Sequence, residues 1–202
     1  MQIDEAARAR DASLPGPSSR QARRLLAEHR PLEAIDLLRG FRDLDPDGRR
    51  ILAEAYMQGS DLRAAAETIA PLLSTGDVPS SVLRTAAAIY VKTGDEDSLQ
   101  RVVARLRGQT AGKAKPLADV EMFLGKLYES QGRYAPALRA YEGSHRANES
   151  RQALLAMARV ADAMGNRERA LLTYRRLCRF DGGKGAACAS AEELAKPANS
   201  WP

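Results

Sequence analysis

Apolar and polar residues are closely intermixed along the whole chain of 202 residues. The longest stretch without charge or strong polarity covers about seven residues, 85–91, against the roughly 18 to 20 that a membrane-spanning helix requires. We therefore expect no membrane span. Abundant Ala, Leu and Arg and only 5% aromatic residues favour helices over strands. The pattern predicts an all-α fold.

A repeat of 33 residues relates the two clearest pairs of predicted helices. The landmarks of the first pair and their counterparts in the second are Gly132 and Gly165, Ala137 and Ala170, Tyr141 and Tyr174. Each copy consists of a helix, a tight turn at glycine and a second helix. The predicted helices are 117–131 and 134–146, then 151–164 and 167–179. Glycine suits the turn because it adopts the left-handed conformation of a helix end without a Cβ penalty.

Weaker copies of the same unit extend towards the N-terminus. The predicted helix pairs are 79–92 with 95–107, 47–58 with 61–73, and 19–28 with 31–44. Asp61 and Asp95 are expected N-caps, and Pro31 suits the first position of a helix. The anchor positions of the second helices are Ala34, Ala64, Leu99, Ala137 and Ala170. Their spacings of 30, 35, 38 and 33 residues predict five hairpins across residues 18–180.

Three further segments complete the predicted organisation. Residues 1–17 form a flexible N-terminal segment, and residues 108–115 form a basic loop between the third and fourth hairpins. Residues 181–196 comprise a Gly-rich joint and a capping helix over 186–195, which would cover the end of the stack. Residues 197–202 are a tail with the single tryptophan, Trp201.

The fourth hairpin carries a recognisable motif, Leu124-Gly125-x-x-Tyr128 followed by Ala137-x-x-x-Tyr141. This hairpin resembles a tetratricopeptide repeat, a helical hairpin of 34 residues with the pattern L-G-x₂-Y…A-x₃-F…P. The resemblance implies an α-solenoid, a right-handed superhelix of about five such hairpins with a C-terminal capping helix. Small residues at Gly125 and Ala137 would let the two helices approach closely, while the tyrosines fill the space towards the neighbouring hairpin.

The other hairpins follow the pattern less closely. The first has Ala34-x-x-x-Leu38 and a closing proline, and the fifth has Ala170-x-x-x-Tyr174 with Ala158 in place of the first glycine. In the second, Ala64 holds the anchor position, but Thr68 stands where an aromatic residue is usual.

The resemblance implies a non-enzymatic interaction scaffold or adaptor that binds a peptide or helix of a partner protein in a concave groove. Small stand-alone bacterial proteins similar to this one are often assembly factors of envelope machines such as pili and secretion systems. By analogy, every hairpin places one base on the inner face: Arg23, Arg49, Arg84, Lys126 and Arg159.

An acidic partner segment would suit these bases. Glu129 and Asp162 lie one turn after Lys126 and Arg159 and are expected to pair with them. An equally good interpretation is that an arginine-rich chain presents arginine on any exposed face. We expect no asparagine clamp for a terminal carboxylate, because Asn148, Asn166 and Asn199 fall in turns or in the tail.

Two alternatives to a protein partner in the groove are nucleic acid and a second copy of the chain. The net charge of +5 bears on the first. Nucleic acid could bind a basic face that comprises Arg20, Arg23, Arg24, Lys113 and Lys115. The 31 basic and 26 acidic residues are mixed nearly everywhere, however, so a protein partner is favoured over nucleic acid. The third possibility is self-association, in which an incompletely capped solenoid end stacks on a second copy.

We find no pattern for catalysis, a metal or a cofactor. H-E-x-x-H, C-x-x-C and G-x-S-x-G are absent from the sequence. The two histidines, His29 and His145, lie near the ends of predicted helices, where the helix dipole favours a cationic imidazole. We therefore expect a protein that is not an enzyme.

Cys178 and Cys188 are ten residues apart, one at the end of the fifth hairpin and one in the capping helix. A disulfide between them would pin the cap and add about 2 to 3 kcal/mol. It would also imply an oxidising compartment, such as the periplasm if Met1 replaces a removed leader. Without a disulfide, the polar N-terminus, which does not resemble an export signal, indicates the cytoplasm by default. Both alternatives are open from the sequence.

Overall fold

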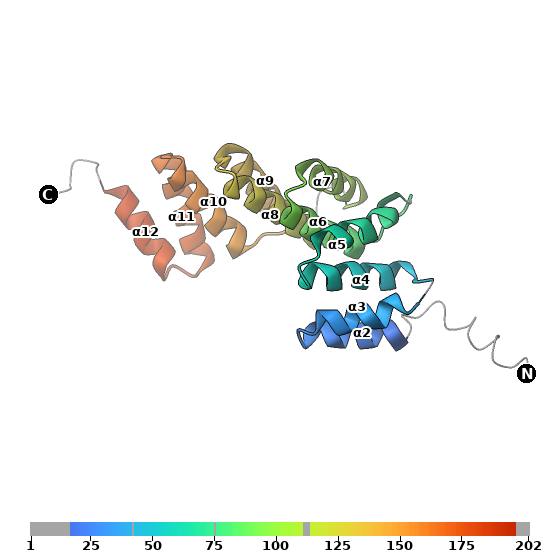
Figure 1. Ribbon diagram of the computed structural model, residues 1–202. Helices are drawn as coiled ribbons and strands as arrows, with labels where there is room; N and C mark the ends of the chain where they lie inside the picture. Colours follow the sequence, from blue (N-terminus) through green and yellow to red (C-terminus); the bar gives the residue numbers. More distant parts are fainter. Residues whose placement is uncertain (1–16, 42, 75, 111–113, 197–202) are drawn as a thin grey trace, which may run out of the picture. The chain divides into compact units, whose positions relative to one another are not determined.

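The computed structural model describes residues 17–41, 43–74, 76–110 and 114–196, and all of its regular elements are helices (Figure 1). The chain divides after Thr93 into two compact units. The division falls between the two helices of the third predicted hairpin. The predicted flexible segment 1–17, apart from Pro17, and the predicted tail 197–202 lie outside the described residues.

Unit 1 contains the helices α2 (Pro17–Ala27), α3 (Pro31–Arg39), α4 (Pro46–Gln58), α5 (Leu62–Ile69) and α6 (Ser80–Thr93), with the 3₁₀ helix η1 (Ala70–Ser74) after α5. Helices α2, α3 and α4 pack against one another, and α5 packs against α4 and α6. The core of the first three helices is aliphatic and includes Ala22, Leu38 and Ile51, each fully buried.

Unit 2 contains the helices α7 (Glu96–Thr110), α8 (Lys115–Ser130), α9 (Tyr134–Ala147), α10 (Arg151–Ala163), α11 (Arg167–Phe180) and α12 (Ala186–Ala195). Each helix packs against the next one in the chain (Figure 1). Helix α12 covers Leu154 and Leu177 together with its own Ala187, so the predicted capping helix is present.

Helix ends follow the signals in the sequence. The side chain of Asp61 accepts a hydrogen bond from the backbone N–H group of Ala64, and that of Asp95 accepts one from Ser98. Each bond is 3.0 Å long. These bonds satisfy amide groups that have no partner within the helix. Pro31 begins α3, where its missing N–H has no cost.

The turn between the two helices of a hairpin uses one residue with positive φ. In the fourth and fifth hairpins this residue is glycine, with φ of 71° at Gly132 and 69° at Gly165. The first two hairpins use His29 (φ 58°) and Ser60 (φ 68°) at the same place. In the second hairpin the left-handed residue is therefore Ser60 and not the preceding Gly59.

Three predicted helix ends differ from the structure by three residues or more. Helix α3 ends at Arg39 and not at residue 44, with Gly40 as its C-cap. Helix α5 gives way to η1 after Ile69, because Pro71 cannot donate a helical hydrogen bond. Helix α7 continues to Thr110, so the connection to α8 is shorter than the predicted loop 108–115.

The residues expected to pack within and between hairpins are mostly buried. Ala34, Ala137, Tyr141 and Ala170 are fully buried, and Leu124, Gly125 and Tyr128 are also buried. Tyr174 is half-buried against the core beneath α12. Ala64 is half-buried, whereas Ala65 is fully buried.

Gly125 shows why a small residue is required at its position. A Cβ atom added there would clash with the aromatic ring of Tyr141 on α9. The absence of a side chain therefore lets α8 and α9 approach closely enough for the ring to lie between them.

Candidate partner-binding site

Tyr141 anchors a polar cluster that joins α8, α9 and α10. Its hydroxyl donates to Glu129 Oε2 over 2.6 Å. The guanidinium of Arg159 binds both oxygens of the same carboxylate, over 2.9 and 2.8 Å. Burial disfavours the charged form of Glu129, but the bonds from Arg159 and Tyr141 outweigh it and hold the pKa of Glu129 below its usual value. Burial and this carboxylate raise the pKa of Tyr141.

Tyr128 anchors a second cluster of the same kind between α7 and α8. Its hydroxyl donates to Glu96 Oε1 over 3.1 Å and accepts from Gln100 Nε2 over 2.8 Å. Arg133 forms an ion pair with Glu96 and lies over the Tyr128 ring, 4.6 Å from its centre. The Arg133 bond lowers the pKa of Glu96. A tyrosine, a glutamate and an arginine thus join neighbouring helices twice in unit 2.

These contacts change the expected role of the predicted inner-face bases. Arg159 forms its ion pair with Glu129 of α8 and not with Asp162, so Glu129 is not the dedicated partner of Lys126. Arg23 forms an ion pair with Asp47, and Arg49 Nε donates to the carbonyl of Leu44 over 3.1 Å. Arg23 and Arg159 therefore already have a carboxylate partner within the chain.

The remaining predicted bases are exposed. Arg84 lies on α6 of unit 1, and Lys126 lies on α8 of unit 2. Lys126 forms part of a hollow of about 250 Å³ between α8, α9 and the start of α10, here called the α8–α10 hollow. Its lining residues are Lys115, Ala118, Asp119, Met122, Phe123, Lys126, Ser144, Asn148, Ser150 and Gln152.

The α8–α10 hollow combines features suited to a peptide. Met122 and Phe123 offer half-buried apolar surface, while Asn148 and Gln152 offer amide groups that both donate and accept hydrogen bonds. Asn148 lies just after the end of α9, as its position in the sequence predicts, and the packing of α8 on α9 places it on the same hollow as Lys126. Lys126 and Asn148 are more than 20 positions apart in the sequence. A local sequence pattern therefore does not indicate that they line the same hollow.

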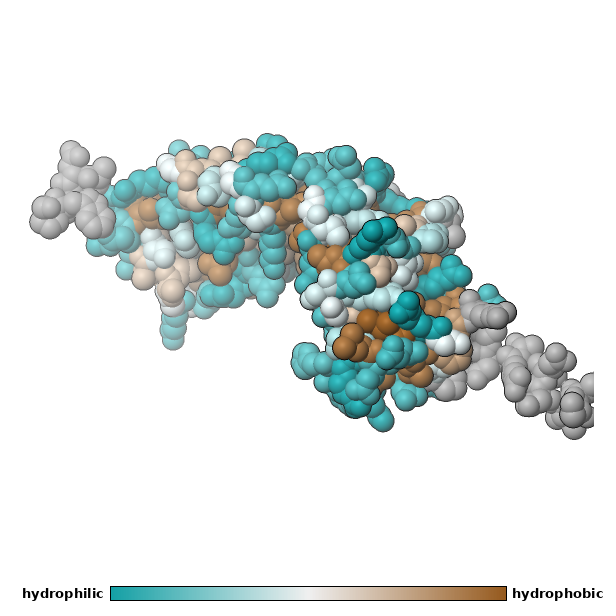
Figure 2. Space-filling model, viewed as in Figure 1, coloured by the Kyte–Doolittle hydropathy of each residue, from teal (hydrophilic) through white to brown (hydrophobic). Residues whose placement is uncertain are grey.

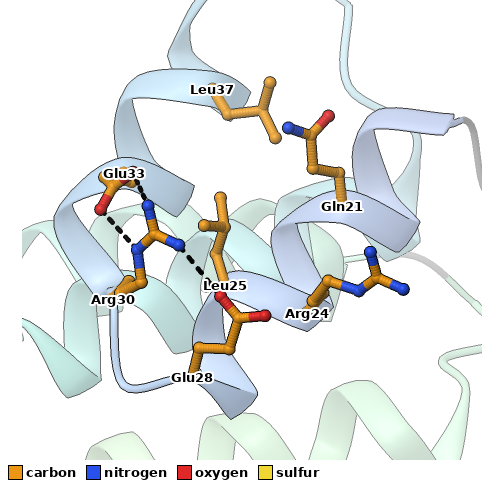
Figure 3. A pocket seen from close by; sticks show the side chains of 7 residues that line it. All are labelled: Gln21, Arg24, Leu25, Glu28, Arg30, Glu33 and Leu37. Atoms are coloured by element: carbon orange, nitrogen blue, oxygen red, sulfur yellow. Dashed lines mark hydrogen bonds and ion pairs between the residues drawn. The ribbon is translucent and has the colours of Figure 1, made fainter.

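A second hollow, of about 480 Å³, lies between α2 and α3 and is called the α2–α3 hollow (Figure 3). Leu25 and Leu37 contribute its apolar surface. Arg30 binds both Glu33 oxygens, over 2.7 and 2.6 Å, and one Glu28 oxygen over 3.0 Å. The same hairpin carries Leu32, whose side chain is 68% exposed, and Figure 2 shows apolar surface over this part of unit 1.

Helix α12 is held at both ends. A disulfide joins Cys188, in its first turn, to Cys178 of α11, with 4.8 Å between the Cα atoms. At the other end, Arg167 donates to the carbonyl oxygens of Leu194 and Lys196, over 3.0 and 2.5 Å. The sequence left open whether these cysteines form a disulfide, and in the structure they do.

Glu121 is a buried carboxylate that the sequence analysis did not identify. It is 1% exposed, and one of its oxygens accepts hydrogen bonds from Arg107 of α7. Burial raises the pKa of Glu121 although Arg107 opposes the shift. Gly143 of α9 leaves room for the carboxyl group, since a Cβ there would lie 2.9 Å from it. The residue links three helices and faces no hollow described above.

His145 differs from the sequence-based expectation. The residue is 6% exposed, and burial together with the nearby charge of Arg176 lowers its pKa. The lowered pKa favours the neutral imidazole at physiological pH, in contrast to the cation expected from the helix end. No group of three or more His, Cys, Asp and Glu side chains that could hold a metal occurs within the described residues. None of the helices described is both long enough and apolar enough to span a membrane.

Stacked antiparallel hairpins with this turn and packing pattern define a tetratricopeptide-like helical-repeat fold. Solved structures agree with that class. A MamA structure from AMB-1 is 18% identical, with a TM-score of 0.61 over 85% of this chain and 94% of that chain. A tetratricopeptide repeat protein from Parabacteroides merdae is 16% identical, with a TM-score of 0.64 over 89% of this chain and 73% of that chain. Another MamA structure is 15% identical, also with a TM-score of 0.64.

No protein-family model matches the chain, and no curated protein matches it at the level of sequence. The likeness to solved structures therefore concerns the fold.

Proposed function

We propose that this protein is a non-enzymatic adaptor that binds a peptide or helix of a partner protein against α8 and α10 of unit 2. The observation that carries the proposal is the α8–α10 hollow, where apolar side chains lie beside Lys126 and two amide side chains. A ligand segment with an apolar anchor and a neighbouring acidic residue fits this chemistry. The apolar anchor would supply most of the affinity, and the lysine would favour an acidic segment over a basic one.

Affinity capture from a lysate of the source organism tests the site with one pair of variants. Lys126→Glu reverses a charge on the hollow, whereas Arg139→Glu reverses a charge on an exposed position of α9 outside it. Arg159→Glu is unsuitable, because it would place two carboxylates together at Glu129. Each capture is repeated after nuclease treatment.

We expect a discrete partner protein to be captured by the wild type and by Arg139→Glu, to be lost with Lys126→Glu, and to withstand nuclease. Equal capture by both variants would contradict the proposed site. Capture that disappears after nuclease would favour the alternative, a nucleic-acid-binding protein with a basic face. For that alternative, Arg23 is already paired with Asp47, and Lys113 lies outside the described residues.

We propose further that the adaptor acts as an assembly factor of a bacterial envelope machine, such as a pilus or a secretion system. The disulfide supports this setting, since disulfides persist mainly in oxidising compartments. Thiol alkylation in intact cells provides the test. Both cysteines should resist alkylation until a reductant is added, and alkylation without reduction would argue for the cytoplasm.

Self-association through the first hairpin is a second candidate. It is favoured by the α2–α3 hollow and by the exposed Leu32 on the same hairpin. Light scattering during gel filtration over a range of concentrations measures it. If two copies bind each other through the first hairpin, Leu32→Asp reduces the rise of the measured mass with protein concentration. Leu172→Asp, at a position of unit 2 that is 58% exposed, serves as the control and leaves the mass unchanged.

A further inference from the structure

A third cavity lies in unit 2, between α9, α10 and α11, and is called the α9–α11 cavity. It has a volume of about 630 Å³. Its lining residues are Glu142, His145, Arg146, Glu149, Met157 and Arg176. None of these residues lines either hollow described above.

His145 carries a buried hydrogen-bond donor that has no partner among the residues that the structure describes. Its Nδ1 accepts a long hydrogen bond of 3.5 Å from the backbone N–H of Ser150. A neutral imidazole that accepts at Nδ1 carries its proton at Nε2. His145 Nε2 is buried and has no hydrogen-bond partner among the described residues. An unsatisfied buried donor has an appreciable free-energy cost. Nε2 is closed to water in the fold, so a ligand in the cavity relieves this cost only if the side chains that cover Nε2 shift and let the ligand accept its hydrogen bond.

Two guanidinium groups line the same cavity. Neither Arg146 nor Arg176 forms a hydrogen bond or ion pair with another described residue. Of the two glutamates, Glu142 is paired with Arg169 of α11. Glu149 therefore supplies the one negative charge on the lining that is not already paired. The balance of charge favours a ligand with a single negative charge over a dianion.

We propose that the α9–α11 cavity binds a carboxylate group. A guanidinium binds a carboxylate through two parallel hydrogen bonds. The imidazole Nε2–H supplies a third donor once the side chains that cover it shift. Met157 provides apolar surface for the carbon chain that carries the group. The carboxylate belongs either to a small organic acid or to an acidic side chain of a partner protein, and both sources use the same contacts.

Nuclear magnetic resonance on the intact protein tests the proposal through the imidazole nitrogens. The chain has two histidines, so a His29→Gln background leaves the signal of His145 alone. The protein is titrated at constant pH and ionic strength with acetate, with inorganic phosphate, and with a short glutamate-rich peptide. The test variant is Arg176→Gln. The matched control is Arg175→Gln, the adjacent exposed arginine of α11, which does not line the cavity.

We expect acetate to shift the His145 Nε2 signal saturably. Arg176→Gln should weaken this binding about tenfold or more, while Arg175→Gln should leave it unchanged. A peptide that binds tighter than acetate identifies a protein partner as the source, and equal affinity identifies a small acid. The proposal is overturned if acetate causes no saturable shift, if phosphate binds more tightly than acetate, or if both arginine variants behave alike.

Discussion

At the scale of single residues, backbone conformation matters most at the turns. Ser60 has a φ of 68°, which residues with a Cβ adopt at a cost of about 1 kcal/mol. We expect Ser60→Gly to raise the free energy of unfolding by about 0.5 to 1 kcal/mol. Ala104→Gly, on the exposed face of α7, should lower it by a similar amount. Urea unfolding measures both, and destabilisation by Ser60→Gly would contradict the left-handed turn.

Packing at Gly125 leads to a second prediction. An alanine there would push the Tyr141 ring away from its place between α8 and α9 and strain its bond to Glu129. Gly125→Ala should lower the free energy of unfolding by about 1 to 3 kcal/mol. Gly108→Ala is the control, since a Cβ at this position of α7 meets no atom within 4 Å. The control should be neutral or stabilising by up to about 1 kcal/mol.

The lowered pKa of His145 predicts how stability depends on pH. The unfolded chain binds a proton with a pKa of about 6.5, whereas the folded chain binds it only at lower pH. The full contribution of His145 is therefore present above about pH 6.5 and is lost as the pH falls through this range towards the folded pKa. Unfolding measured at about pH 7.5 and 5.5 should show a smaller pH effect in His145→Gln than in the wild type. An unchanged pH effect in that variant would refute the assignment.

At the scale of helices and turns, the sequence predicted most of what the structure contains. Proline at helix starts, aspartate caps and periodic glycines act within a few residues of one another, so they can be recognised locally. One predicted helix end differs from the structure at a local signal, Pro71, which ends α5. The turns at His29 and Ser60 could not be recognised as left-handed from residue type, because tertiary packing imposes a conformation that neither residue prefers.

The capping helix allows a prediction at this scale. The disulfide closes a short loop between α11 and α12 and restricts the unfolded chain. Its removal in Cys178→Ser/Cys188→Ser should lower the free energy of unfolding by about 2 to 3 kcal/mol. Urea unfolding with and without a reductant provides the measurement. The reductant should destabilise the wild type and leave the double variant unchanged; equal effects on the two would argue against the bond.

At the scale of the whole molecule, the sequence predicted the repeat fold but only part of the candidate site. It identified Lys126 from its place in the repeat, and the resemblance to tetratricopeptide repeats supplied the expected inner face. It did not identify the carboxylate partners of Arg23 and Arg159, which lie 24 and 30 positions away in the sequence. Such pairs depend on how successive helices pack, which residue spacing within one helix cannot reveal.

The disulfide also divides the chain into a ring and two arms. The joint between α11 and α12 has three glycines with positive φ and an exposed Lys184, and it lies inside the ring. A single cut by trypsin after Lys184 should therefore leave the two fragments covalently attached. The nicked protein should migrate as one chain on a denaturing gel and separate into two fragments only after reduction. The last helix would thus survive the loss of its peptide connection to the rest of the protein.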